Sequence, residues 1–133
     1  MKRVLIVDDD PDIREIAVTG FEISGGWEIR EAASGLEALE LARLDPPDVI
    51  LLDVMMPETD GPTTVLLLQA DERTRHVPVI FLSAKVHLAE RPPGICGFIT
   101  KPFDPLTLPD TVAEIVELRA AEAGARNVSI PPA

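Results

Sequence analysis

Acidic, hydroxyl and basic side chains follow the apolar runs of this sequence at the points where those runs end. Asp8 and Asp9 come directly after the first run, and Asp53 follows the third. Ser83 follows the fourth run, and Lys101 comes shortly after the fifth. All strands of a parallel sheet point the same way, so residues that follow different strands meet at one edge of it. The sequence therefore predicts that these five side chains converge.

Carboxylates that meet at such an edge repel one another unless a cation lies among them. No histidine or cysteine adjoins these acids in the sequence, and oxygen ligands alone favour Mg²⁺ or Mn²⁺ over zinc. Lys101 adds a charge suited to a phosphoryl group or to Asp53, and Ser83 adds a hydroxyl donor. Together these groups predict a site for phosphoryl transfer, with a carboxylate as nucleophile.

The elements that must position these residues can be recognised from hydrophobic periodicity. Five runs are expected strands: 4–7, 27–30, 49–52, 79–82 and 95–99. Their largely continuous apolar character indicates a parallel sheet covered by helices on both faces. The alternation of strands and helices predicts a doubly wound α/β domain.

Helices are expected between the strands, and caps mark where they begin. Asp10-Pro11 predicts the first helix, Ser34 and Glu37 fit a capping box for the second, and the third spans 62–70. The last is expected over 106–121. The stripes expected to face the sheet are Ile13, Ile16, Ala17 and Phe21, then Leu36, Leu39 and Ala42, and finally Val112, Ile115 and Val116. Pro92-Pro93-Gly94 stops any helix near Glu90, so the fourth helix is predicted to be shortened or irregular.

Composition limits the class of protein. The 133 residues suit one domain, expected over 1–122, with a loosely ordered tail over 123–133. A net charge of −11 disfavours direct binding to nucleic acid. No apolar run is long enough for a membrane span, no secretory signal is evident, and Cys96 is the single cysteine. A cytoplasmic location is expected.

Four segments together resemble the receiver domain of two-component response regulators: VLIVDDDPDIREI, DVILLDVMMPETDG, PVIFLSAK and FITKPFDP. The resemblance covers about residues 2–121. It implies a flavodoxin-like five-stranded parallel sheet in the order 2-1-3-4-5. It also implies a phosphorelay component in signal transduction that is a switch and not an enzyme, apart from its own phosphorylation and slow autodephosphorylation.

By that resemblance, Asp53 is the phosphoacceptor, and its donor is a phosphohistidine of a histidine kinase or a phosphotransfer protein. Asp8, Asp9, Asp53 and the main-chain carbonyl of Met55 hold Mg²⁺ or Mn²⁺. Lys101 pairs with Asp53 and then with the phosphoryl group.

The resemblance also implies how the signal is passed on. Ser83 donates to the phosphoryl group, and Phe98 is the aromatic residue that rotates as Ser83 moves. The bond between Lys101 and Pro102 is a candidate cis peptide. The altered fourth helix puts the usual dimer surface in question, so a monomer or weak dimer is expected, with an unknown downstream protein. The chain is expected to be either a stand-alone receiver or a piece of a larger regulator.

Plainer interpretations stay open for several residues. Asp10 is expected to be only a helix cap, Phe98 is a core residue by default, and a serine like Ser83 is a common cap. The functional alternatives are an aspartate-nucleophile phosphatase, a degenerate receiver that is not phosphorylated, and a flavin or nucleotide binder. The phosphatase is disfavoured because Met55 stands where such enzymes place a second acid.

Overall fold

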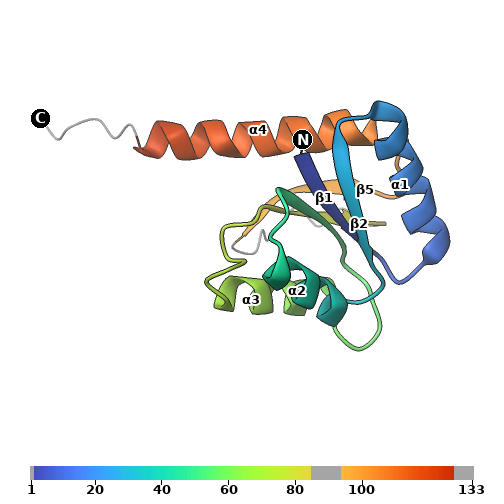
Figure 1. The fold of residues 1–133 in the computed structure, drawn as a ribbon, viewed down its shortest axis with the longest axis horizontal. Coiled ribbons are helices and arrows are strands. Elements are labelled where there is room, and N and C mark those ends of the chain that lie inside the picture. Colours follow the sequence, from blue (N-terminus) through green and yellow to red (C-terminus); the bar gives the residue numbers. More distant parts are fainter. Residues whose placement is uncertain (1, 85–93, 128–133) are drawn as a thin grey trace, which may run out of the picture.

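The apolar runs form a five-stranded, wholly parallel sheet in the order β2-β1-β3-β4-β5 (Figure 1). The structure is a computed structural model that describes residues 2–84 and 94–127. The elements are β1 (Lys2–Val7), α1 (Pro11–Ser24), β2 (Trp27–Ala32), α2 (Gly35–Leu44), β3 (Val49–Asp53), α3 (Gly61–Ala70), β4 (Val79–Ser83), β5 (Ile95–Thr100) and α4 (Leu108–Asn127). The predicted doubly wound, flavodoxin-like fold and its strand order are confirmed.

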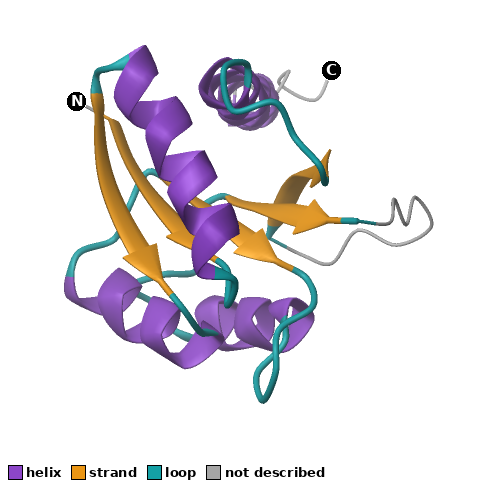
Figure 2. Ribbon diagram, turned by 90° about the vertical axis from the view of Figure 1, so that its right-hand side faces the viewer, coloured by secondary structure: helices purple, strands orange, loops and turns teal. Residues whose placement is uncertain are grey.

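The sheet separates two hydrophobic cores because successive side chains of a strand point to opposite faces. Val4 and Ile6 of β1 pack under α1 and α4, whereas Leu5 and Val7 pack under α2 and α3. Figure 2 shows the sheet between these two helix layers. The middle strand β3 is buried along its whole length, from Val49 to Asp53. The acid at its end is therefore held by a rigid element.

Polar caps set where the helices begin. The Asp10 carboxylate accepts from the Asp12 amide at 2.9 Å, as predicted for the start of α1. Ser34 accepts from the Glu37 amide at 3.1 Å, and Glu37 returns a bond to the Ala33 amide, one residue before the amide that a strict capping box would use. Asp60 caps α3 by accepting from the Thr63 amide at 2.8 Å.

Two residues of the predicted apolar stripes are exposed. Ile16 is 43% exposed because α1 buries Ala17, Gly20 and Phe21, and Ile16 lies beside that stripe. Leu36 is 55% exposed because the small residues at the start of α2 allow that helix to lie close to its neighbours. Both predictions were wrong since small buried residues carry little hydrophobic signal in a sequence.

The last helix is longer than predicted. It ends at Asn127 and not near Ala121, so it continues into the segment predicted as a loose tail. Val112 is fully buried, and Ile115 and Val116 are half-buried against the sheet, as expected. The division at residue 122 stays a prediction, and the predicted short fourth helix lies outside the described residues.

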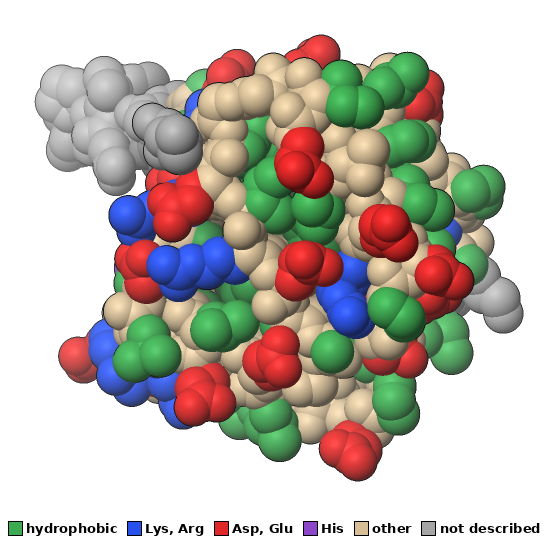
Figure 3. Space-filling model, turned by 45° about the vertical axis from the view of Figure 1, so that its right-hand side comes forward, with side chains coloured by type: hydrophobic (Ala, Val, Ile, Leu, Met, Phe, Trp, Pro, Cys, Tyr) green, Lys and Arg blue, Asp and Glu red, His purple; other side chains and the backbone are tan. Residues whose placement is uncertain are grey.

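The surface carries the excess of acidic residues that the composition requires. On the face in Figure 3, Asp and Glu side chains are dispersed among apolar and neutral ones, with fewer Lys and Arg. Within residues 2–84 and 94–127, no helix combines the length and apolar character that crossing a membrane needs.

Candidate functional site

Asp53 ends β3 at the carboxyl edge of the sheet, where it is only 6% exposed. The loop that follows turns back tightly, and the Gly61 amide donates to the Val54 carbonyl at 2.9 Å. A Cβ on Gly61 would lie 2.8 Å from both the Asp53 carbonyl oxygen and the Val54 Cα. Glycine is therefore required here by close backbone approach, which keeps the loop folded against the end of β3.

Asp8 follows β1 and is fully buried, so its charge needs partners. Its Oδ1 accepts from the Asp10 amide at 3.0 Å, and its Oδ2 accepts from Lys101 Nζ at 2.7 Å. The same Lys101 Nζ lies 3.2 Å from Asp53 Oδ1. Lys101 thus bridges the two acids, and its shorter contact is with Asp8, whereas the sequence suggested Asp53 as its partner.

Asp9 completes a group of three acids. One carboxylate oxygen from each of Asp8, Asp9 and Asp53 lies within 4.8 Å of the others. A set made only of carboxylate oxygens, with an exposed member open to solvent, matches what Mg²⁺ or Mn²⁺ binds. The predicted residues are therefore brought together and form a cluster that could hold such an ion.

The electrostatics of the cluster reflect its crowding. Burial raises the pKa of Asp53, the negative charge of Asp8 raises it further, and Lys101 only partly offsets these effects. Burial lowers the pKa of Lys101, but its hydrogen bond to Asp8 and the charges of both acids outweigh this effect, so its pKa is raised. Lys101 therefore stays protonated, and it lies beside Asp53, whose charged form is disfavoured.

Ser83 ends β4, which pairs with β3, and Phe98 lies on β5, the edge strand that pairs with β4. Ser83 pairs in register with Thr100, and its carbonyl accepts from the Lys101 amide at 2.8 Å, so Ser83 and Lys101 are fixed side by side. Phe98 is half-buried and packs its ring against Phe81, with centroids 5.8 Å apart. The peptide between Lys101 and Pro102 is cis, as predicted.

The loop after Asp53 presents an apolar side chain to solvent. Met55 is 80% exposed, and its amide donates to Asp53 Oδ1 at 3.4 Å. This loop lines an open hollow of about 470 Å³ with Val54, Met56 and Pro57 on its walls. Apart from Asp60, the residues that line this hollow are apolar.

The contact between Arg14 and Asp8 was not predicted from the sequence. The Arg14 guanidinium, on the first turns of α1, donates from Nη1 to the Asp8 main-chain carbonyl at 2.6 Å. The signal that could have revealed Arg14 is its place four residues after the cap Asp10, which directs it back towards the acids.

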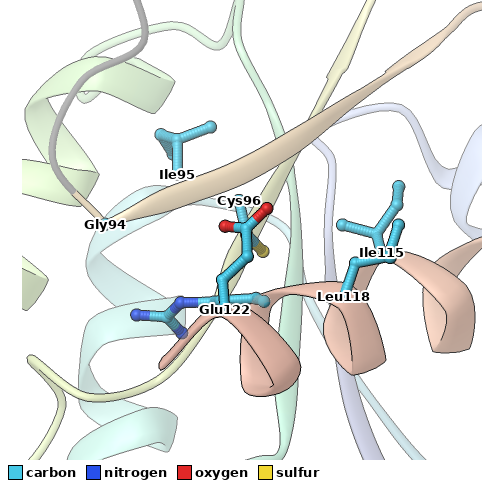
Figure 4. Close-up of a pocket in the computed structure, with 7 residues that line it drawn as sticks. Gly94, Ile95, Cys96, Ile115, Leu118 and Glu122 are labelled. Atoms are coloured by element: carbon cyan, nitrogen blue, oxygen red, sulfur yellow. The ribbon is translucent and has the colours of Figure 1, made fainter. Parts of the chain in front are cut away.

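Another hollow, of about 500 Å³, lies at the opposite end of the sheet from the acids. It opens between the start of β5 and the later turns of α4, with Ile95, Cys96, Ile115 and Glu122 among its lining residues (Figure 4). Cys96 Sγ lies 3.4 Å from the Val79 carbonyl oxygen, and Cys96 is half-buried. This hollow contains none of the predicted site residues.

The fold and the site define a class: flavodoxin-like α/β domains with an acidic pocket and a lysine at the carboxyl edge of the sheet. Residues 4–113 match the family described as "Response regulator receiver domain". The chain therefore belongs to the receiver domains of two-component response regulators.

Known proteins agree with this assignment. The chain is 37% identical over 108 residues to the "DNA-binding dual master transcriptional regulator RpaA" of Synechocystis, covering 78% of this chain and 44% of that protein. It is 36% identical over 142 residues to the response regulator PleD of Caulobacter vibrioides, covering 96% of this chain and 30% of PleD. The chain thus spans half or less of the length of these two relatives.

A solved structure agrees over most of both chains. The chemotaxis response regulator CheY4 of Vibrio cholerae is similar with a TM-score of 0.79 and 31% identity, over 86% of this chain and 98% of CheY4.

Proposed function

We propose that Asp53 accepts a phosphoryl group from the phosphohistidine of a sensor histidine kinase or phosphotransfer protein. The observation that supports this most directly is the gathering of Asp8, Asp9 and Asp53 within 4.8 Å, with Lys101 Nζ at 2.7 Å and 3.2 Å from two of them. Such an arrangement stabilises the negative charge that builds up on a transferring phosphoryl group.

In the proposed reaction a carboxylate oxygen of Asp53 attacks the phosphorus atom. The bond between phosphorus and the donor imidazole nitrogen breaks, its electron pair stays on that nitrogen, and an acyl phosphate remains on Asp53. Asp8, Asp9, Asp53 and the Met55 carbonyl would hold Mg²⁺ or Mn²⁺, which supplies positive charge to the phosphoryl oxygens. Lys101 turns from the acids to the new phosphoryl oxygens.

We infer that the response begins at Ser83 and Phe98. Ser83 lies at the end of β4, adjacent to Lys101 across the strand pair, where its hydroxyl would reach a phosphoryl oxygen on Asp53. Movement of Ser83 would free space for the half-buried ring of Phe98, and this biases a protein-interaction surface between two states. The downstream partner is a protein that recognises one of these states.

The proposed phosphorylated state decays slowly. The exposed side chain beside the acceptor is the thioether of Met55, which cannot orient an attacking water as a carboxamide or carboxylate would. The chain then acts in the cytoplasm as a switch, as a monomer or weak dimer, and its chemistry is limited to its own phosphorylation and dephosphorylation.

Intact mass spectrometry tests the proposal. The protein is incubated with acetyl phosphate with Mg²⁺ or with EDTA, and Asp53→Asn is compared with Glu58→Gln, a matched control that neutralises an exposed acid of the same loop. We expect a gain of one phosphoryl group in the wild type and in Glu58→Gln, only with Mg²⁺, and none in Asp53→Asn.

Two results would contradict the proposal. Labelling that persists in Asp53→Asn would place the acceptor elsewhere, and absence of labelling in the wild type would indicate a receiver that works without phosphorylation. Multiple turnover of a phosphoester such as p-nitrophenyl phosphate, with no stable adduct, would instead indicate a phosphatase.

A further inference from the structure

Arg14 joins three elements at the edge of the acidic site. Its Nη1 donates to the Asp8 main-chain carbonyl at 2.6 Å, and its Nε lies 3.4 Å from Glu31 Oε1 at the end of β2. The Arg14 side chain is only 18% exposed, although it is charged and lies on a surface helix. The guanidinium is therefore held between the end of β1 and the end of β2.

The Asp8 carbonyl that Arg14 contacts belongs to the peptide that leads into Asp9. The Asp9 carboxylate makes no hydrogen bond or ion pair with the residues that the structure describes, and Asp9 is exposed. Its position near Asp8 and Asp53 consequently depends on the orientation of the peptide that joins Asp8 to Asp9. The carbonyl of that peptide is the group that Arg14 holds.

We propose that Arg14 is a positioning residue for the cation site, acting through its two-pronged guanidinium and not through its charge. The inference rests on the proposed function, because it takes Asp8, Asp9 and Asp53 as the residues that bind Mg²⁺ or Mn²⁺. Groups that orient a metal ligand commonly change metal affinity by about 10- to 100-fold when they are removed. Arg14 would orient the turn that carries Asp8 and Asp9, two of the three acids.

Electrostatics alone would give the opposite result. Arg14 is a cation close to a site for a cation, so removing its charge makes the site more negative and should strengthen metal binding. Loss of positioning should weaken binding, because the Asp8–Asp9 peptide is no longer fixed. The sign of the change therefore distinguishes the two roles.

Direct Mn²⁺ binding tests the inference. Free Mn²⁺ is measured by electron paramagnetic resonance during titration of the wild type, Arg14→Met, Arg14→Lys, Glu31→Gln and Asp9→Asn. Arg43→Met is the matched control, since Arg43 also forms an ion pair, with Asp71 at 2.6 Å, but touches none of the site residues. Thermal unfolding in EDTA is recorded for each variant. The Mn²⁺ titrations are then run well below the lowest unfolding temperature among the variants.

We expect Arg14→Met to weaken Mn²⁺ binding by about tenfold, while Arg43→Met binds as the wild type does. Arg14→Lys should also bind more weakly, because an ammonium lacks the planar fork that reaches both partners. Glu31→Gln should weaken binding by a smaller factor, and it keeps the test valid if Arg14→Met does not fold.

Unchanged or tighter binding in Arg14→Met, or wild-type binding in Arg14→Lys, would overturn the inference alone. A wild type that binds no Mn²⁺, or an Asp9→Asn variant that binds as the wild type does, would instead contradict the proposed metal site. The two failures are thus distinguishable.

Discussion

Among single residues, Asp53 is a carboxylate held where its negative charge is unfavourable. Burial and the neighbouring charge of Asp8 raise its pKa above the ordinary 3.8, in spite of Lys101. Between 3.8 and the raised pKa, the folded protein binds more protons than the unfolded chain, so stability falls as pH rises through that range. Above the raised pKa the folded protein bears the full cost of the charged carboxylate.

Asp53→Asn should therefore stabilise the metal-free protein at pH 7, because it removes the buried charge that burial and Asp8 disfavour. The gain should shrink as pH is lowered, because Asp53 itself then becomes neutral. Urea unfolding in EDTA at pH 7 and at pH 4 measures it, and Glu40→Gln serves as a control that removes an equal charge from an exposed site. An equal gain in both variants would show that net charge, and not the local site, is responsible.

Among the elements, α1 and the loop after β5 approach so closely that a glycine is needed. A Cβ on Gly20 would lie 2.2 Å from the Pro105 carbonyl oxygen. The loop begins with Lys101, whose amide is bound to the Ser83 carbonyl. The contact at Gly20 thus helps to set how the segment carrying Lys101 lies against the sheet.

Gly20→Ala should consequently destabilise the protein by about 1–3 kcal/mol, the usual cost of overpacking. In an unobstructed helix the same change would stabilise by up to about 1 kcal/mol, so the sign is diagnostic. Chemical denaturation of Gly20→Ala beside Thr19→Ala, an exposed position on the same helix, gives the measurement. A more stable Gly20→Ala would mean that the loop can move away at little cost.

For the molecule as a whole, self-repulsion and the acidic site both respond to cations. With a net charge of −11, simple salt should stabilise the fold by screening. An ion that also binds the three acids should stabilise it further, because binding to the folded state alone shifts the unfolding equilibrium.

We expect Mg²⁺ to raise the unfolding midpoint by more than NaCl of equal ionic strength does. At a concentration 100 times the dissociation constant, binding adds about 2.7 kcal/mol of stability. Differential scanning calorimetry of the wild type and of Asp9→Asn, with each salt, separates binding from screening. If NaCl raises the midpoint as much as Mg²⁺ does, the three acids do not bind the ion. The same holds if Asp9→Asn keeps the additional rise that Mg²⁺ gives over NaCl.

Much of the fold follows from patterns that depend on the sequence alone. The continuous apolar runs identified the strands because strands covered on both faces need apolar residues on both sides. The N-cap signals at Asp10-Pro11 and Ser34 located the first turns of α1 and α2. Residues that follow parallel strands must meet at one edge, so Asp8, Asp53 and Lys101 could be placed together from topology.

Other features depended on packing that no local pattern records. Ile16 and Leu36 are exposed because glycine and alanine occupy the contact stripes beside them. The end of α4 was misplaced because glycine commonly follows the end of a helix, whereas α4 continues through Gly124 to Asn127.

The sequence by itself determined that three acids and a lysine meet at the carboxyl edge of a parallel sheet, because strand direction alone requires it. Only the tertiary structure decided that Lys101 lies closer to Asp8 than to Asp53, and that Arg14 holds the Asp8 carbonyl. These contacts join residues from separate elements over distances of about 3 Å. These contacts are set by how helices and strands pack together, and that packing cannot be read from the local sequence pattern.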